Sequence, residues 1–412
     1  MHRRNLEDRR ASKGLVLALI LIGMAVAGCD SGAGRPYSGG FVRELGAESA
    51  NRQQVTIAPD PLLRLGGGAD GEATEFTQIG DAVIGQDGVI SVLNIGTAEL
   101  RVFDKGGKHL RTVGRRGQGP GEFSRPVLVP TIRRDTLLVA DRSGPVTAIA
   151  PSAGTYRVLG SFGAIGDAGG ESGGSLFIHQ TLSTASGNSE TGETVNQVAL
   201  DAIDLGSQTR ARIAVYDGRR MYVAMPSAEQ MQDPTQRPRV RFLTVPFTTD
   251  PSFAPSPRGL YVRDGWAPEI KEVDRTGRIL RIIRVNVPPV EVSSRNFNTA
   301  VEEDVALING EVERARLGRY YSDMRRPSNA PIFGKLLTDP QGRLWAQYLG
   351  LDRGKSRTWM VFDESGGILG TVKIPGSGAV TSVGDDAIVT ITTDELGIEA
   401  IEVYALTWSA RA

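Results

Sequence analysis

Cysteine and histidine are scarce in this 412-residue sequence, and it carries no net charge. The chain has one cysteine and three histidines, and lysine plus arginine equal aspartate plus glutamate at 47 each. A single cysteine excludes an internal disulfide framework and a zinc site made of cysteines. Without a positive overall field, nothing draws the chain to nucleic acid or to an acidic membrane surface. We therefore expect no nucleic-acid partner.

The common catalytic motifs are missing as well. No His-X-His, HExxH or Asp-X-Asp-X-Asp pattern of metal-binding residues occurs, and no Gly-X-Ser-X-Gly nucleophile elbow is present. His2 lies in the basic N-terminal segment, so His109 and His179 alone are left for the rest of the chain. We expect no bound cofactor and no metal ligand that the sequence identifies.

The N-terminus has the pattern of a secretory signal. Five arginine and lysine residues lie between positions 2 and 13, and an uninterrupted apolar run follows at 14–28. Such a basic segment before an apolar one is typical of export signals. The run is shorter than the roughly 20 apolar residues that span a bilayer. We therefore interpret residues 1–28 as a cleaved signal peptide.

The end of this run, Val26-Ala27-Gly28-Cys29, resembles the lipobox of bacterial lipoproteins. The resemblance implies that Cys29 carries a diacylglyceryl thioether and an N-terminal acyl group such as palmitate. Several acyl chains on one residue make membrane attachment stable. The protein would then be held to a membrane of the cell envelope, facing the periplasm or the cell surface. The alternative is an ordinary signal peptide with a chance cysteine.

Residues 29–58 are rich in glycine, serine and polar residues without periodicity, which predicts a flexible tether. After it, short strand-like runs alternate with Asp-Gly and Gly-Gly turns, and one full copy of this pattern spans 86–113. Equivalent strand endings fall near positions 104, 150, 217, 274, 363 and 404. Six radially repeated units of about 40 to 50 residues predict an all-β, six-bladed β-propeller over 59–412.

One segment within the first repeat carries a more specific resemblance. Residues 113–123 read Val-Gly-Arg-Arg-Gly-Gln-Gly-Pro-Gly-Glu-Phe, which resembles the glycine-rich crossing between blades in NHL-repeat, TolB-like and related propellers. Blade 3 is the poorest copy, and its polar stretch at 181–194 predicts a long loop. We also expect blade 1 to take a strand from the other terminus, which would close the ring and remove its exposed edges.

Residues 291–325 break the strand pattern. Phe297, Val301, Val305 and Ile308 recur at helical spacing, and Ser293 or Ser294 can cap the start of a helix. Gly310 can separate this helix from a second one at 311–323. The segment falls between the outer strand of blade 4 and the inner strand of blade 5. We therefore predict a helical insertion that projects over the entrance face of the ring.

The ends of the second strands and the crossings between blades should lie on this same face. Exposed tryptophan and arginine side chains are frequent hot spots of binding surfaces. The alternative for these residues is a solvated rim. The candidate binding face comprises Arg115, Arg116, Glu122, Asp141, Arg142, Asp264, Trp266 and Arg353.

Repeated aspartates and the two histidines have structural interpretations first. Aspartates that end outer strands before glycine turns bond the backbone two residues on. We expect His109 on the rim, in an outer strand, and His179 on the surface of the polar third blade. The aspartates interpreted as turn residues are Asp104, Asp217, Asp274 and Asp363.

Two hypotheses about function remain. The first is a monomeric, membrane-anchored scaffold, without enzymatic activity, that binds a protein, peptide or glycan through its entrance face. The alternative is a propeller hydrolase or lyase that acts on a small molecule with a divalent metal in the central channel. A structural propeller with degenerate function is a third reading, because the fold hosts many functions.

Overall fold

The computed structural model describes most of the chain after the first forty residues. Cys29, the interpreted signal peptide and the start of the predicted tether lie outside the described residues. Within the described ranges, no helix is long and apolar enough to cross a membrane. The described residues are 41–45, 53–68, 71–85, 87–133, 135–182, 191–226, 231–232 and 239–410.

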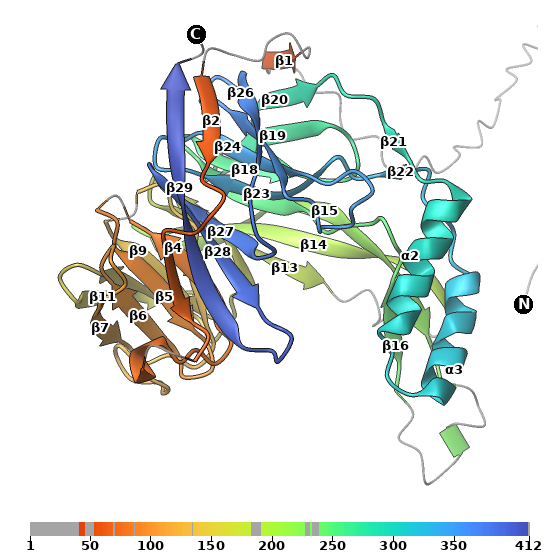
Figure 1. Ribbon diagram of the computed structural model, residues 1–412, viewed down its shortest axis with the longest axis horizontal. Coiled ribbons are helices and arrows are strands. Elements are labelled where there is room, and N and C mark those ends of the chain that lie inside the picture. Colours follow the sequence, from red (N-terminus) through yellow and green to blue (C-terminus); the bar gives the residue numbers. More distant parts are fainter. Residues whose placement is uncertain are drawn as a thin grey trace, which may run out of the picture. The chain divides into compact units, whose positions relative to one another are not determined.

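Six sheets form the six blades of a β-propeller, which confirms the predicted fold class (Figure 1). Each blade is built on strands that follow one another in chain order with antiparallel pairing, and N-terminal strands are added to blades 4 and 6. Blade 1 consists of β4 (Ile79–Ile84), β5 (Ile90–Asn94), β6 (Glu99–Phe103) and β7 (His109–Val113). Blade 2 consists of β8 (Pro126–Val129), β9 (Leu137–Asp141), β10 (Pro145–Ala150) and β11 (Thr155–Ser161).

Blades 3 and 4 each carry a fifth strand. Blade 3 consists of β12 (Asp167–Ser172), β13 (Ser175–Leu182), β14 (Gly192–Asp204), β15 (Thr209–Ala224) and the added β16 (Arg241–Thr244). Blade 4 consists of β17 (Ser252–Ser256), β18 (Gly259–Arg263), β19 (Glu269–Val273), β20 (Ile279–Val285) and β1 (Phe41–Leu45), which pairs with β20 in parallel.

Blades 5 and 6 complete the ring. Blade 5 consists of β23 (Phe333–Thr338), β24 (Leu344–Tyr348), β25 (Thr358–Phe362) and β26 (Ile368–Lys373). Blade 6 consists of β27 (Ala379–Val383), β28 (Ala387–Thr393), β29 (Glu399–Ala410), and the two N-terminal strands β2 (Gln53–Ile57) and β3 (Leu63–Gly66).

The N-terminal segment closes the ring at blade 6. β3 pairs with the first half of β29, and β2 pairs with its second half. The expectation that blade 1 borrows a strand is therefore wrong, because blade 1 has four consecutive strands of its own. The predicted tether at 29–58 also extends too far, since β1 and β2 lie within it. Their partners are more than two hundred residues away, so no local pattern reveals the pairing.

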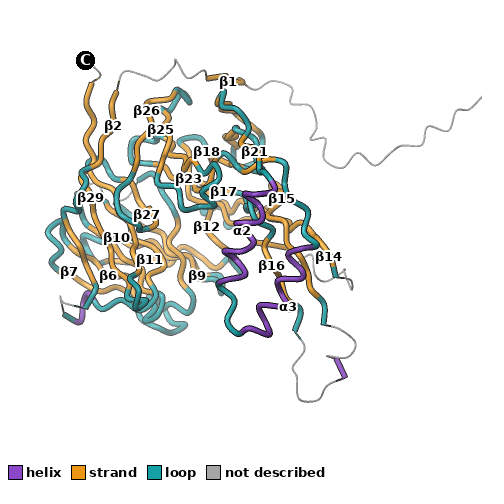
Figure 2. Tube along the Cα trace, turned by 45° about the vertical axis from the view of Figure 1, so that its right-hand side comes forward, coloured by secondary structure: helices purple, strands orange, loops and turns teal. Residues whose placement is uncertain are grey.

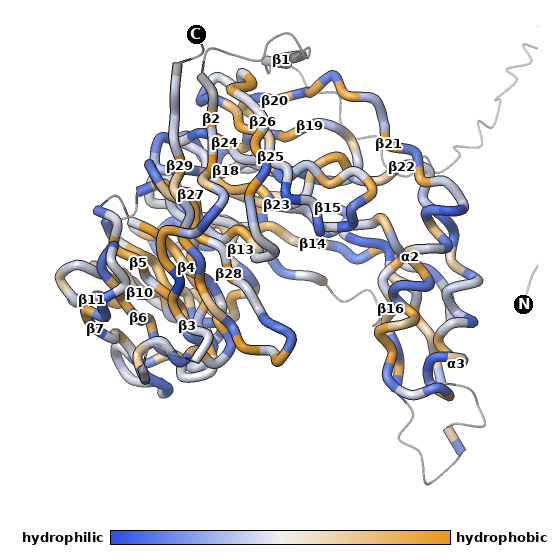
Figure 3. Tube along the Cα trace, in the orientation of Figure 1, coloured by the Kyte–Doolittle hydropathy of each residue, from blue (hydrophilic) through white to orange (hydrophobic). Residues whose placement is uncertain are grey.

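Apolar clusters fill all six junctions between neighbouring blades, as expected for packed sheet faces. At the junction of blades 5 and 6, for example, Trp345 and Trp359 pack against Val380 and Ile388. Trp345 is thus fully buried between two blades. Figure 3 shows hydrophobic stretches along the blade strands and hydrophilic ones in many of the connecting loops. These six interfaces supply most of the buried apolar surface that stabilises the ring.

Two helices interrupt the strand pattern between blades 4 and 5, α2 (Ser294–Ala306) and α3 (Glu311–Ser322) (Figure 2). The Ser293 side chain accepts the Asn296 N–H, and Asn296 bonds back to the Ser293 backbone, which makes a capping box. The short pair of β21 (Val290–Glu291) and β22 (Asn329–Ala330) joins the two ends of the insertion. Both helices fall within the predicted range 291–325.

The helices pack on an extension of blade 3. β14 and β15 continue past the blade as a long hairpin, and β16 pairs with the end of β15. Tyr222, Phe247, Phe297 and Tyr321 lie in one buried cluster between this extension and the helices. We call α2, α3, β16 and the adjoining ends of β14 and β15 the lobe. The loop predicted at 181–194 is therefore partly strand at both ends, whereas 183–190 lies outside the described residues.

Candidate functional site

The entrance face of the ring is made by the crossings between blades and by the loops that join second to third strands. The lobe rises from this face, because β14 begins there and β15 ends there. The insertion that holds α2 and α3 is itself the crossing from blade 4 to blade 5. Seven of the eight residues of the predicted binding face lie in these crossings and loops, and Asp141 is the last residue of β9, where that strand enters the loop.

The crossing from blade 1 to blade 2 is held in place by its own polar residues. Glu122 accepts hydrogen bonds from the Gly119 N–H at 2.9 Å and from Arg115 Nε at 2.8 Å. The Gly119 N–H and the Arg115 guanidinium hold the pKa of Glu122 below its ordinary value. Gly114 has φ 87°, and a Cβ there would lie 2.4 Å from the buried Phe123 ring. The glycine-rich sequence thus serves a close turn.

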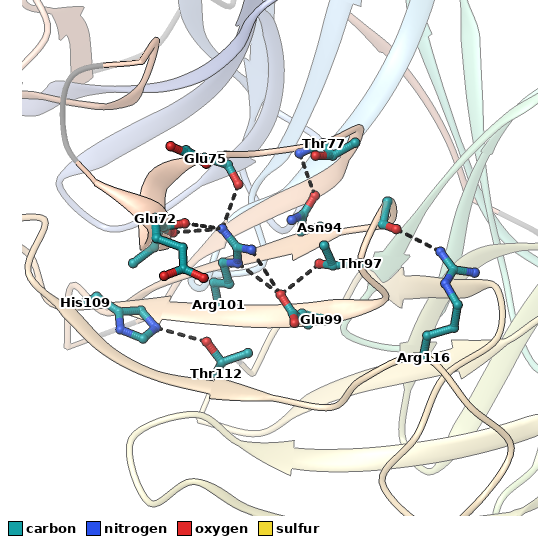
Figure 4. A network of polar contacts seen from close by, with 12 residues as sticks. Glu72, Glu75, Thr77, Asn94, Thr97, Glu99, Arg101, His109, Thr112 and Arg116 are labelled. Atoms are coloured by element: carbon teal, nitrogen blue, oxygen red, sulfur yellow. Dashed lines mark hydrogen bonds and ion pairs between the residues drawn. The ribbon is translucent and has the colours of Figure 1, made fainter.

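Arg116 binds backbone rather than projecting freely. Its guanidinium donates to the Gly96 carbonyl at 2.8 Å (Figure 4). Figure 4 also shows Arg101 on β6, which donates to the carbonyls of Glu72 and Glu75 at 3.1 and 2.7 Å. This arginine fixes the segment that leads from the closing strands into blade 1. Both arginines stabilise loops of the face.

Asp141 is buried beneath the loop of blade 2. Its Oδ2 accepts the Ser124 and Arg125 N–H groups at 2.6 and 3.0 Å, and its Oδ1 accepts the Ser143 N–H at 2.9 Å. Burial alone would raise the pKa of Asp141, but these hydrogen bonds hold it below its ordinary value. Its neighbour Arg142 forms an ion pair with Asp167 at the start of blade 3. Asp141 is buried within its own blade, whereas the half-exposed Arg142 joins blade 2 to blade 3.

Arg353 anchors the lobe to blade 5. Its guanidinium contacts both carboxylate oxygens of Asp304 on α2 at 2.6 Å and donates to the Ala300 carbonyl at 3.2 Å. The same group lies 5.9 Å from the centroid of the Phe247 ring. Both contacts to Asp304 come from Arg353 Nη2, while Nη1 donates to the Ala300 carbonyl, so charge-assisted hydrogen bonds join the loop to α2. The predicted binding residue therefore has a structural role here.

Asp264 and Trp266 occupy the loop of blade 4. Asp264 pairs with Lys271, whose Nζ lies 2.9 Å from both carboxylate oxygens. Trp266 is 51% exposed. Of the eight predicted residues, seven are engaged in contacts within the fold, and the eighth, Trp266, presents a large apolar side chain to solvent.

The centre of the ring holds a cavity of about 270 Å³. The first strand of every blade contributes to its lining, which identifies β4, β8, β12, β17, β23 and β27 as the inner strands. Hydroxyl groups in the lining join adjacent blades. Thr381 donates to the Ala82 carbonyl at 2.9 Å, and Ser252 Oγ accepts the Leu336 N–H at 2.9 Å. Part of the polar lining therefore stabilises the ring.

Lys335 brings a positive charge into this channel. Its ammonium donates to the Val380 carbonyl at 2.8 Å. Protein surrounds the Lys335 side chain, although solvent in the channel reaches it. Desolvation by the surrounding protein lowers the pKa of Lys335, and the nearby Asp81 carboxylate acts to raise it. Because lysine is otherwise a surface residue, a lysine on an inner strand is a notable feature of the site.

His179 also lines the channel, so its interpretation as a surface residue of blade 3 is wrong. It lies near the end of β13, opposite Asp167 on β12. Its ring packs on Phe253 with centroids 4.7 Å apart. Burial lowers the pKa of His179, although the carboxylates of Asp167 and Asp250 act to raise it. The degenerate repeat in blade 3 concealed the register that would have placed it.

The positions of His109 and of the repeated aspartates agree with the prediction, with one exception. His109 lies on β7, the outer strand of blade 1, with Nε2 3.1 Å from Thr112 Oγ1. Asp104, Asp274 and Asp363 accept N–H groups two residues on, at 2.8 to 2.9 Å. Asp217 does not end a strand, because β15 continues through it into the lobe. Within the described residues, no group of three or more His, Cys, Asp or Glu side chains is arranged to hold a metal.

Comparisons with known proteins agree with the fold. Residues 72–127 match the model of the DUF5128 family, described as a 6-bladed beta-propeller. The match covers blade 1 and the beginning of blade 2. No curated protein matches the chain.

Two solved structures illustrate the similarity in fold. A member of the DUF4221 family from Bacteroides vulgatus is 12% identical, with 88% of this chain and 100% of that chain covered at a TM-score of 0.47. A calcium-binding protein, regucalcin, from Agrobacterium tumefaciens is 13% identical, with 81% and 92% covered at a TM-score of 0.38.

Proposed function

We propose that this chain is a lipid-anchored binding protein of the cell envelope that presents its entrance face and lobe to a partner protein. The anchor in this proposal is Cys29, whose sequence context resembles a lipobox. The fold is a six-bladed propeller, and the NHL-like and TolB-like resemblance of its glycine-rich crossing fits this type of protein. Propellers commonly use one face of the ring for recognition, but the fold alone does not specify a ligand.

The observation that carries the proposal is the exposed apolar tip of the lobe. Leu307 and Val312, at the turn between α2 and α3, are 80% and 84% exposed. Phe242 on β16 is 52% exposed, and the adjacent Arg241 forms an ion pair with Glu313 at 3.2 Å. This ion pair holds β16 beside the start of α3. We call Phe242, Leu307 and Val312 the lobe tip.

Two physical features make the lobe tip a binding surface. It stands on a lobe with its own buried cluster and an arginine anchor, so it is presented rigidly. Preorganised apolar side chains bind with little loss of conformational entropy. Trp266 adds a second exposed apolar group on the entrance face. Apolar contacts of this kind, surrounded by charged side chains, are typical of protein–protein interfaces.

The experiment that tests this function is capture of a partner in intact cells by the anchored chain and by a lobe-tip variant, Leu307→Ser with Val312→Ser. The matched control is Leu110→Ser with Val158→Ser, which removes exposed apolar side chains from the outer strands of blades 1 and 2. The partner is identified by its loss from the lobe-tip variant and its retention by the control.

The competing hypothesis is a channel enzyme with a divalent metal. The lining contains Asp81, Asp167 and His179, but among the described residues these three side chains are not arranged as a metal-binding group. Metal analysis of the purified full chain decides between the two readings. A stoichiometric, tightly held ion would favour the enzyme.

A further inference from the structure

Lys335 has hydrogen-bonding capacity that the protein does not use. Its ammonium has three N–H donors, and the bond to the Val380 carbonyl takes one of them. Among the described residues it forms no ion pair within 4 Å, although Asp81 is near enough to influence it. Solvent in the channel reaches the Lys335 side chain, so water or a ligand can accept hydrogen bonds from the other two N–H groups. Lys335 lines the central cavity, so a molecule in the channel can reach its ammonium.

His179 offers a second hydrogen-bond donor, on blade 3, which is separated from blade 5 by one blade. Among the described residues its ring packs on Phe253 and makes no hydrogen bond through either nitrogen. Burial keeps the imidazole neutral, and a neutral imidazole has one N–H donor and one acceptor. Lys335 belongs to blade 5 and His179 to blade 3, so the two groups approach the channel from different sides.

The rest of the lining is suited to a small molecule with an apolar body. Phe253, Val127 and Leu337 line the same cavity. Its volume of about 270 Å³ exceeds the roughly 150 Å³ in which a protein cavity binds benzene. Apolar walls with a few convergent polar groups are the usual composition of a small-molecule site.

The two carboxylates of the lining do not make the site anionic. Asp167 forms an ion pair with Arg142, which neutralises its charge. Asp81 accepts the Ala82 N–H at 2.9 Å and lies near Lys335. Together with a neutral His179, these four charges cancel. The lining is therefore neutral overall. Lys335 and His179 both have N–H groups that can donate a hydrogen bond to a ligand.

We propose that the central channel binds a small organic carboxylate with an apolar body, held by the Lys335 ammonium and by a ring N–H of His179. The carboxylate accepts hydrogen bonds from both groups, and the apolar body lies against Phe253. Charge-assisted hydrogen bonds of this kind favour a carboxylate over a neutral amide of the same shape. This site is separate from the lobe tip, so its failure would leave the proposed protein-binding function standing.

The test is a calorimetric titration of the full chain with benzoate and with benzamide, which have nearly the same shape and differ in charge. We expect benzoate to bind about tenfold more tightly or better, as one charge-assisted hydrogen bond implies. Lys335→Met should abolish this preference. The matched control, Lys105→Met, removes an exposed lysine from a turn of blade 1 and should preserve it.

Lys335→Gln serves as a second variant because it keeps a donor for the Val380 carbonyl while removing the charge. It should also lose the preference for benzoate, and thermal unfolding verifies that each variant is folded. The comparison of the two probes on the natural chain needs no variant at all. The proposal is overturned if benzoate does not bind, if benzamide binds equally well, or if folded Lys335→Met binds benzoate as tightly as the natural chain.

Discussion

Asp141 organises the passage from blade 1 to blade 2 from a buried position. Four hydrogen bonds reach its carboxylate, three from backbone N–H groups and one from the Ser143 hydroxyl at 2.7 Å. An amide in its place would offer one acceptor oxygen and a competing NH₂ group to the same donors. The side chain therefore carries a substantial share of the local stability, although it forms no ion pair with any residue that the structure describes.

Asp141→Asn should lower the free energy of unfolding by about 1 to 3 kcal/mol, because buried N–H groups lose their acceptor. The measurement is denaturant unfolding of the variant beside Asp60→Asn, which changes an exposed carboxyl. A loss equal to that of the control would contradict this account.

The same variant should change the dependence of stability on pH. The pKa of Asp141 is lowered in the folded protein, so its contribution is present above the unfolded-state value of about 3.9 and is lost as pH falls through the lowered folded-state pKa. Asp141→Asn should therefore flatten the acid side of the stability curve.

At the scale of elements, the lobe depends on one arginine from a neighbouring blade. Arg353 bonds α2 through Asp304 and the Ala300 carbonyl, and it adopts φ 50° in its loop. A positive φ is uncommon for a residue other than glycine and is retained where the surroundings determine it. Here the contacts of the Arg353 side chain with α2 hold the backbone in this conformation.

Arg353→Met should release α2 from blade 5 without unfolding the ring. Loss of the charge-assisted bonds should raise hydrogen exchange of α2 amides by about tenfold or more, since such bonds contribute roughly 1.5 to 3 kcal/mol. The strands of the blades should keep their protection. Arg319→Met, which changes an exposed residue of α3, is the control. Unchanged exchange in α2 would show that apolar packing alone holds the lobe.

Elements joined by local turns could be predicted from the sequence, and distant pairings could not. The hairpins ending at Asp104, Asp274 and Asp363 follow from turn chemistry within a few residues. Asp217 has the same appearance, but β15 continues through it because the lobe supplies partners for the extended hairpin. The pairing of β2 with β29 depends on residues more than three hundred positions apart.

The candidate site was predicted less completely than the fold. Position along the repeat placed all eight surface residues on the entrance face, yet it could not reveal that Asp141 is buried or that Arg353 bonds a helix. The channel residues Lys335 and His179 were missed because alternation alone does not distinguish the inner strand of a ring from the other strands. Lys335, a lysine within the first strand of a blade, was the one sequence signal that pointed to a polar channel.

At the scale of the whole molecule, the proposed anchor at Cys29 precedes in the sequence the strands that close the ring. β2 and β3 complete blade 6, and β1 adds to the edge of blade 4. Our proposal attaches lipid to Cys29, which precedes β1 by about a dozen residues. In this proposal, the number of residues between Cys29 and β1 limits how far β1 can lie from the membrane surface, since an extended chain spans at most about 3.5 Å per residue.

Cys29→Ser should move the protein from the membrane fraction to the soluble fraction, because it removes the sulfur that would carry the lipid. The measurement is fractionation of cells that express the variant or the natural chain, in buffers of low and high salt. A neutral chain offers little electrostatic attraction in place of the lipid. Membrane association that persists in the variant would contradict lipidation at this residue.

The capture experiment with the lobe-tip variant, carried out in intact cells with the anchor retained, tests the central claim most directly. Chemical crosslinking should join a partner protein to the natural chain and to Leu110→Ser with Val158→Ser, whereas Leu307→Ser with Val312→Ser should lose that partner while remaining folded and anchored. If the folded lobe-tip variant recovers every crosslinked protein as well as the natural chain does, recognition through the lobe is contradicted.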